Sequence, residues 1–160
     1  MSAEIVFLWV GKISAPYARS GIDDYLRRAN RYRPSRTLSV AEEKQGSRYT
    51  TEHRLEREGS AILQRLDALT PATVVALDPR GSVLTSRELA ALVERTCYQE
   101  SRRMVFVVGG PDGLSSAIRE RADRLLALTR MTLPHDLARL LLAEQIYRAL
   151  TIIHGHPYDR

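Results

Sequence analysis

A glycine-rich stretch follows a short apolar run in the second half of the chain. Residues 104–108 are apolar, with β-branched and aromatic side chains, and they stop abruptly at Gly109-Gly110-Pro111-Asp112-Gly113. Because glycine adopts backbone conformations that other residues avoid, such a loop can wrap closely around a small ligand and offer it backbone N–H groups. The same pattern also fits a tight turn between a strand and a helix, so the loop alone leaves both interpretations open.

Two common nucleotide-binding signatures are missing from this sequence. The pattern G-x-G-x-x-G does not follow the first apolar run, and G-x-x-x-x-G-K-[ST] occurs nowhere in the chain. The glycines of those motifs bring the backbone close to phosphate groups. The sequence therefore argues against a dinucleotide-binding Rossmann site and against a P-loop.

An imidazole follows directly after an extended apolar segment at residues 131–135, which read Met-Thr-Leu-Pro-His. Pro134 suits the first turn of a helix, so His135 would lie at a helix N-terminus. There the helix dipole favours a neutral imidazole or helps a histidine to hold an anion. The alternative is that Pro134-His135 only opens the helix, and residue chemistry alone favours that alternative.

Two other features have mainly structural interpretations. Glu144 and Arg148 lie four residues apart, so they can pair on one face of a helix, although a carboxylate in an apolar setting also suits catalysis. Cys97 is the only cysteine, which excludes intramolecular disulfides and cysteine-based metal clusters. Its apolar neighbours Leu92 and Val93 predict a buried, structural thiol.

The pattern of apolar residues predicts strands that alternate with helices. We expect strands over residues 4–10, 37–40, 73–77, 104–108 and 125–128. We expect a helix with Pro16 in its first turn in the segment that Pro34 closes, and further helices over 51–69, after a capping box at Thr85–Glu88, from Ser115 or Ser116 to Ala122, and over 134–154. The polar stretch at residues 42–51 predicts a flexible surface loop.

This alternation predicts an α/β fold with a mostly parallel sheet and helices on both faces. In such sheets ligands bind beyond the carboxyl ends of the strands. Applied to the predicted strands, the rule selects three loops, at residues 78–81, 109–114 and 129–134. The first of them reads Asp-Pro-Arg-Gly, which we interpret as a turn.

Composition predicts one cytoplasmic domain over residues 1–160. Hydrophobic residues make up 44% of the chain, but no run approaches the roughly 18 to 20 apolar residues that span a membrane, and no secretory leader is recognisable. The net charge is +5, and arginine is much the commoner cation. Arginine favours a polyanionic partner such as nucleic acid, whereas a solvated basic surface is the alternative.

Several motifs follow one another in a fixed order along the chain. They are Val10-Gly11-Lys12, residues 21–28, residues 107–115, Met131-Thr132-Leu133-Pro134-His135, residues 144–149 and His156-Pro157-Tyr158. Together they resemble the ribosomal large subunit pseudouridine N3-methyltransferases of the SPOUT superfamily, and the resemblance covers essentially the whole chain.

This resemblance implies a deep trefoil knot in the C-terminal half, a homodimer, and S-adenosylmethionine bound in the knot. It implies no metal and no membrane. Residues in matching positions would contact the cofactor, namely Leu77, Gly109, Gly110, Leu128, Thr129, Arg130, Met131, Thr132 and Leu133. Protein chains rarely thread through their own loops, so general rules of chain topology do not predict such a knot.

The implied reaction is methyl transfer to N3 of a pseudouridine in large-subunit ribosomal RNA, within an assembled ribosome. The matching motifs give His135, Tyr158 and Arg160 as catalytic candidates. The family tail usually reads His-Pro-Tyr-His, whereas Asp159 follows Tyr158 here, so we leave the catalytic base unassigned and interpret Tyr158 and Arg160 as substrate-positioning groups. Asp159 as a replacement base is an alternative.

Two arginines of the last predicted helix, Arg139 and Arg148, are candidates for contact with RNA or with the partner subunit. Two other functions stay open beside the leading hypothesis. The chain could methylate another RNA position with the same cofactor, or it could be a non-catalytic RNA-binding or ribosome-assembly factor.

Overall fold

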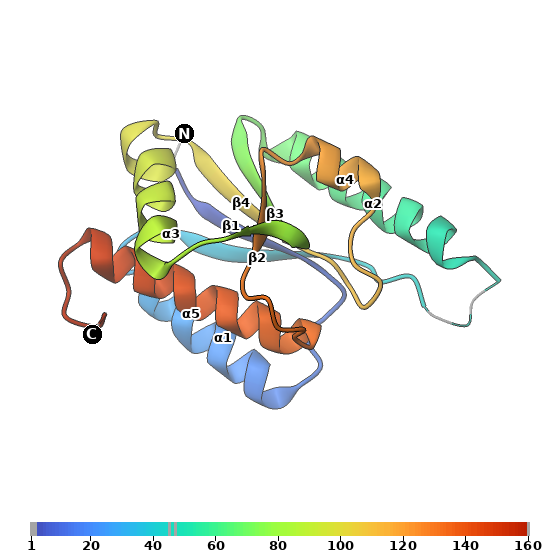
Figure 1. Ribbon diagram of the computed structural model, residues 1–160, viewed down its shortest axis with the longest axis horizontal. Coiled ribbons are helices and arrows are strands. Elements are labelled where there is room, and N and C mark those ends of the chain that lie inside the picture. The colour runs from blue at the N-terminus through green and yellow to red at the C-terminus, as the bar shows by residue number, and fades with distance from the viewer. Residues whose placement is uncertain (1–2, 45, 47, 160) are drawn as a thin grey trace.

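Five parallel strands form one sheet at the centre of the molecule (Figure 1). The computed structural model describes residues 3–44, 46 and 48–159. The strands lie in the order β2-β1-β4-β3-β5. Their bounds are β1 (Ile5–Val10), β2 (Ser35–Val40), β3 (Ala72–Val83), β4 (Arg103–Val108) and β5 (Arg124–Ala127). The predicted α/β class with a parallel sheet is confirmed.

Helices cover both faces of this sheet, as the alternating pattern predicts (Figure 1). Helices α1, α3 and α5 pack together on one face, and α2 packs with α4 on the other. Their bounds are α1 (Pro16–Ala29), α2 (Thr51–Leu69), α3 (Ser86–Val93), α4 (Ser116–Arg121) and α5 (His135–Ile153), and a π-helical segment, η1 (Glu94–Gln99), extends α3.

Side chains alternate between two cores along the central strands. In β1, Phe7 and Trp9 belong to the core beneath α1, α3 and α5, whereas Val6 and Leu8 belong to the core beneath α2 and α4. Residues 104–108 of β4 are buried in the same alternating way, and β4 is hydrogen-bonded to β1 and β3 on its two edges. The glycine loop therefore starts from a fixed central strand.

Side-chain caps explain two of the helix starts. The hydroxyl of Thr50 accepts the His53 N–H at 3.1 Å, and Thr85 forms the predicted capping box with Glu88. Such caps satisfy N–H groups that have no partner inside the helix. Helix α5 begins at His135 directly after Pro134, in agreement with the sequence prediction.

Strand β3 extends beyond its predicted end at Leu77, with an irregularity at residues 78–81, because Leu77 and Ser82 both pair with Leu126 of β5. It continues to Val83, and its last residues, Ser82 and Val83, pair with Leu126 and Ala127 of β5. A Cβ added at Gly81 would lie 2.5 Å from the backbone nitrogen of Leu126, so only glycine fits this crossing. The chain is therefore interrupted at residues 78–81 as the sequence predicts, but its return to β5 after the interruption was not predicted.

Cys97 has the structural environment that its neighbours predict. The thiol is buried in η1, and burial raises the pKa of Cys97 to about 11.

Strand β2 begins two residues earlier than expected, at Ser35. Within the described residues, no helix is long and apolar enough to cross a membrane.

Candidate functional site

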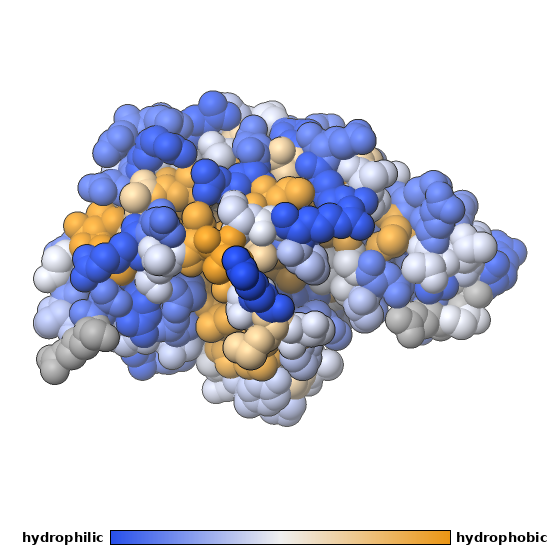
Figure 2. All heavy atoms as spheres, in the orientation of Figure 1, coloured by the Kyte–Doolittle hydropathy of each residue, from blue (hydrophilic) through white to orange (hydrophobic). Residues whose placement is uncertain are grey.

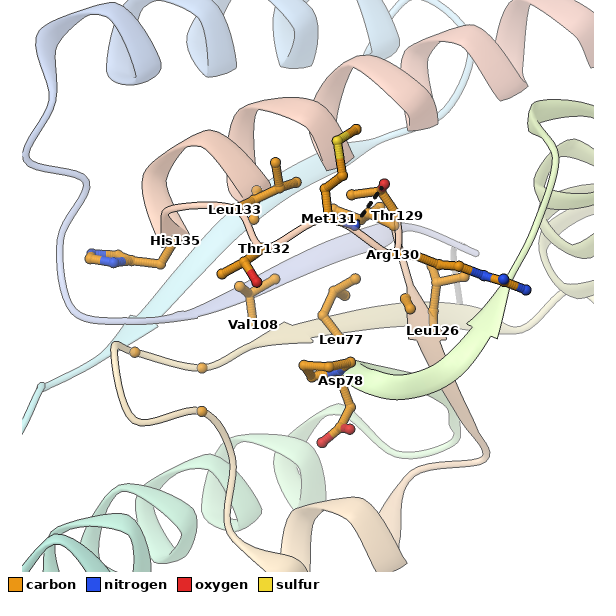
Figure 3. A pocket seen from close by; sticks show the side chains of 17 residues that line it. Leu77, Asp78, Val108, Leu126, Thr129, Arg130, Met131, Thr132, Leu133 and His135 are labelled. Carbon is orange, nitrogen blue, oxygen red and sulfur yellow. Dashed lines mark hydrogen bonds between the residues drawn. The ribbon is translucent and has the colours of Figure 1, made fainter.

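A cavity of about 260 Å³ lies beyond the carboxyl ends of β3, β4 and β5 (Figure 3). Its walls come from the three loops that the strand-end rule selects. Nine pocket residues are those expected to contact a cofactor: Leu77, Gly109, Gly110, Leu128, Thr129, Arg130, Met131, Thr132 and Leu133. His135 also lines the cavity. The fold thus brings together residues that are distant in sequence.

The glycine loop folds back onto itself at the end of β4. The Gly113 N–H donates to the Gly110 carbonyl at 3.0 Å, and a Cβ added at Gly109 would lie 2.4 Å from the Gly113 oxygen. Real Cβ atoms essentially never come that close to another heavy atom. The loop therefore presents a wall of backbone to the cavity, and a side chain at Gly109 does not fit.

Apolar side chains form most of the remaining wall. Figure 3 shows Leu77, Val108 and Thr132 facing the same space between the strand ends and the loop at residues 129–133. Within that loop, the Met131 N–H donates to the hydroxyl of Thr129 at 3.2 Å. Apolar walls with a few backbone polar groups are typical of small-molecule pockets.

Asp78 is a pocket residue that the sequence reasoning did not name. It is buried, and its carboxylate accepts the Arg80 N–H at 2.8 Å and lies 3.9 Å from the Arg119 guanidinium. Figure 3 shows the carboxylate turned away from the loop at residues 129–133. Asp78 directly follows the apolar residues 73–77 and lies in one of the three selected loops. That position could have identified it from the sequence as a pocket residue.

His135 lies at the rim of the cavity beside a buried carboxylate. Its Nε2 atom is 3.8 Å from Asp136 Oδ1. Burial by itself raises the pKa of Asp136, but the Ala15 N–H, the Ser14 hydroxyl and the charges of His135 and Arg139 together bring that pKa below its ordinary value of 3.8. Asp136 is therefore ionised at neutral pH. It accepts hydrogen bonds from Ser14 N, Ser14 Oγ and Ala15 N at 3.2, 3.0 and 2.9 Å.

Arg139 contradicts the expectation that it contacts RNA or a partner subunit. Its side chain is 0% exposed, and it donates to the carbonyls of Val10 and Lys12 while lying 3.5 Å from Asp136. Burial lowers the pKa of Arg139 from its ordinary value. Arg139 and Asp136 together fasten the connection between β1 and α1 to the start of α5, so they hold the element that carries His135.

Tyr158 lies away from the cavity within this chain. Its hydroxyl donates to Glu144 Oε1 at 3.0 Å, and the Arg148 guanidinium lies 4.7 Å from its ring centroid. Glu144 is about 13 Å along α5 from His135, from the helical rise of 1.5 Å per residue. The structure therefore does not bring Tyr158 to His135, and Arg160 lies outside the described residues.

Burial, together with hydrogen bonds to Tyr25 and Glu144, raises the pKa of Tyr158 well above its ordinary value. The phenol is therefore neutral here at physiological pH and donates its proton in a hydrogen bond. In this position Tyr158 has the properties of a positioning group and not of a base.

Two arginines hold Asp159 in the C-terminal tail. Its carboxylate is 3.0 Å from Arg148 and 3.3 Å from Arg87. Arg148 also pairs with Glu144 at 2.7 Å, which confirms the ion pair predicted from their spacing. These contacts fix the tail against α3 and α5.

The described part of the chain contains no group of three or more His, Cys, Asp or Glu side chains that could hold a metal ion.

Comparison with known proteins identifies the family. A family model described as "Predicted SPOUT methyltransferase" matches residues 3–159. The chain belongs to the SPOUT methyltransferase family. Two curated relatives are both named ribosomal RNA large subunit methyltransferase H. The protein from Syntrophotalea carbinolica is 40% identical over 155 residues, and that from Geobacter metallireducens is 43% identical over 157, each match covering 97% of both chains.

Solved structures agree with this SPOUT assignment at the level of the fold. A probable methyltransferase from Bordetella pertussis has a TM-score of 0.57 at 20% identity, and the match covers 92% of this chain and 95% of that one. A tRNA (m1G37) methyltransferase from Aquifex aeolicus has a TM-score of 0.59 at 11% identity, with 98% and 75% covered. At these identities the likeness shows a shared SPOUT fold alone.

Proposed function

We propose that this SPOUT protein transfers a methyl group from S-adenosylmethionine to N3 of a pseudouridine in large-subunit ribosomal RNA. The observation that carries the proposal is its identity of about 40% over nearly the full length of relatives named for large-subunit ribosomal RNA methylation. The pocket adds support, because every residue expected to contact the cofactor lines one cavity. With a ribosomal substrate, we expect the activity in the cytoplasm.

The residues of the cavity fit this cofactor. Gly109 leaves no room for a Cβ, and its loop offers backbone groups where a polar ligand edge needs them. Leu77, Val108 and Leu133 supply apolar surface for an adenine ring. S-adenosylmethionine contains no phosphate, so the lack of a phosphate-binding motif in the sequence agrees with it. When bound, the cofactor supplies an electrophilic methyl group on a sulfonium.

The protein must also make the ring nitrogen a nucleophile. N3 of a uracil-type ring is a poor nucleophile while it carries its proton, so removing that proton or stabilising the resulting anion is the main electrostatic task. His135 lies at the cavity rim and at the N-terminus of α5, where the helix dipole favours negative charge. We assign to it the binding of the developing anion. Holding both reactants in line provides much of the remaining acceleration.

A homodimer and a trefoil knot are parts of the same proposal. Two apolar side chains near the cavity, Met131 and Leu137, are 75% and 36% exposed, and a second subunit would cover such residues. Figure 2 shows hydrophobic side chains gathered across the middle of this face. A partner would also let Tyr158 and Arg160 of one chain reach the cavity of the other. The tight crossing of Gly81 over β5 supports a knot at this place.

Ribosomes that lack the modification provide the test. We expect the purified protein to transfer label from methyl-labelled S-adenosylmethionine to their large-subunit RNA. Label at a different nucleotide would replace the proposed substrate by another RNA position. No incorporation, together with no heat of cofactor binding in calorimetry, would favour a non-catalytic RNA-binding factor instead.

A further inference from the structure

A cluster of aromatic and basic side chains lies at the start of α2, outside the cavity. We call it the Tyr49 cluster, and it consists of Arg48, Tyr49, His53 and Arg57. The rings of Tyr49 and His53 are in contact, with their centroids 4.6 Å apart and their planes tilted by 31°. The guanidinium groups of Arg48 and Arg57 lie 5.3 and 5.0 Å from the Tyr49 centroid. The cluster therefore brings a second aromatic ring and two cations around Tyr49.

This cluster is accessible at one end of the molecule. Arg48 and His53 are exposed, and half of the Arg57 side chain is exposed. Figure 1 shows the first turn of α2 at the extremity of the molecule, and Figure 2 shows hydrophilic side chains over that end. Glu43 pairs with Arg57 at 3.0 Å and offsets part of its charge. Arg48 is therefore the main source of positive charge in the cluster.

A buried arginine connects the Tyr49 cluster to the cavity. Arg54 is 8% exposed, donates to the Tyr49 carbonyl at 2.9 Å, and lies 3.4 Å from Asp112 in the glycine loop. The same guanidinium donates to Thr51 Oγ1 at 3.0 Å. One side chain thus contacts both the segment that carries Tyr49 and the glycine loop that lines the cavity. A ligand on the cluster would be fixed relative to the cavity.

Exposed aromatic rings next to arginine are the side chains that recognise unpaired bases. Every base has a flat π-face, so stacking on Tyr or His holds single-stranded RNA with little regard to sequence. Arginine adds a phosphate contact or stacks on the base itself. A protein partner would need a larger apolar area, whereas these exposed side chains are polar or aromatic.

We propose that the Tyr49 cluster is a second RNA contact, on which an unpaired base near the target nucleotide stacks against His53. This proposal rests on the proposed function, because it takes RNA as the substrate. Arg48 binds the adjoining phosphate. Arg54 holds the cluster in a fixed position beside the glycine loop, so the stacked base keeps the target nucleotide in register with the cavity.

The test measures binding of an unstructured RNA of about ten nucleotides that carries the fluorescent base 2-aminopurine. We expect His53→Ala to weaken binding about tenfold and to remove most of the stacking-induced fluorescence quenching. His53→Phe keeps a ring and should retain both. Arg65→Ala is the matched control, because Arg65 is exposed on the same helix about 18 Å further along its axis.

Salt dependence separates stacking from charge in the same experiment. Loss of a phosphate contact lowers the slope of log K against log salt by about one, so Arg48→Ala should lower it while His53→Ala leaves it unchanged. Calorimetry should give unaltered S-adenosylmethionine affinity for His53→Ala, which confirms that the variant is folded. If His53→Ala binds the RNA as tightly as the wild type and quenches its fluorescence equally, the proposal is overturned.

The second RNA contact and the proposed methyltransferase function can be refuted independently of each other. If the wild-type protein methylates ribosomes and His53→Ala does so with an unchanged KM for ribosomes, the second contact is wrong and the function stands. If the wild-type protein does not methylate ribosomes but His53→Ala loses RNA affinity and quenching, the contact stands and the function is wrong.

Discussion

Replacing Gly109 by alanine tests the glycine loop as a wall of the cofactor cavity. The added Cβ would lie 2.4 Å from the Gly113 oxygen and 2.7 Å from the Gly113 carbonyl carbon. Both are backbone atoms, so they cannot swing aside as the end of a flexible side chain can. To reach even 3.0 Å, the oxygen must retreat by at least 0.6 Å, which opens the turn between Gly110 and Gly113.

The size of the effect follows from that displacement. Forcing an extra methyl into a filled space costs about 1–3 kcal/mol. The free loop relaxes by moving out of its native position, and a bound cofactor must push it back, so the strain enters the free energy of binding. At about 1.4 kcal/mol for each tenfold change, the S-adenosylmethionine affinity should fall about 5- to 150-fold.

Isothermal calorimetry on Gly109→Ala and Gly110→Ala measures this difference. At Gly110 the nearest atom to an added Cβ is a side-chain carbon of Val10 at 3.3 Å, which is only mildly tight. We therefore expect a clearly smaller loss for Gly110→Ala. Far-ultraviolet circular dichroism and thermal unfolding show whether both variants are folded. Equal affinity of Gly109→Ala and the wild type would refute the role given to this loop.

Three other predictions concern buried groups. Arg139→Leu leaves Asp136 without its buried partner and should cost about 3–5 kcal/mol in urea unfolding, and a loss below about 1 kcal/mol would contradict the buried pair. The folded-state pKa of Asp136 is lowered, so its contribution to stability is present above its ordinary pKa of 3.8 and is lost as the pH falls through the lower folded value. The difference in thermal stability between the wild type and Asp136→Asn should therefore be full at neutral pH and shrink below about pH 4, whereas a constant difference would argue against it. Because burial raises the pKa of Cys97 to about 11, iodoacetamide should modify it slowly at pH 8 until urea unfolds the chain, and rapid reaction of the native protein would show an exposed thiol.

Much of the fold and of the cavity could be predicted because local patterns specify them. The continuous apolar runs at residues 5–10 and 104–108 reflect two cores, one on each face of the sheet. The capping box at Thr85 and Pro134 before α5 mark helix starts within a few residues of sequence. Once the strands were placed, the strand-end rule alone selected the three loops that line the cavity.

The remaining features depend on partners that are distant in sequence. Strand β3 continues to Val83 because β5 pairs with it, and no local pattern announces that pairing. Arg139 has the pattern of a surface cation, yet Asp136 and two carbonyls of the connection between β1 and α1 bury it. The position of Tyr158 depends on Glu144 and Arg148, which the sequence paired with each other but not with the tail.

The central claim is methyl transfer to N3 of a pseudouridine in large-subunit ribosomal RNA. Its most direct test incubates the protein and deuteromethyl-labelled S-adenosylmethionine with ribosomes that lack the modification, followed by mass spectrometry of the digested large-subunit RNA. We predict one labelled nucleoside, a pseudouridine methylated at N3, at a single position, with a lower yield from Gly109→Ala at limiting cofactor. Label on any other nucleoside, or no label from protein that binds the cofactor, would contradict the claim.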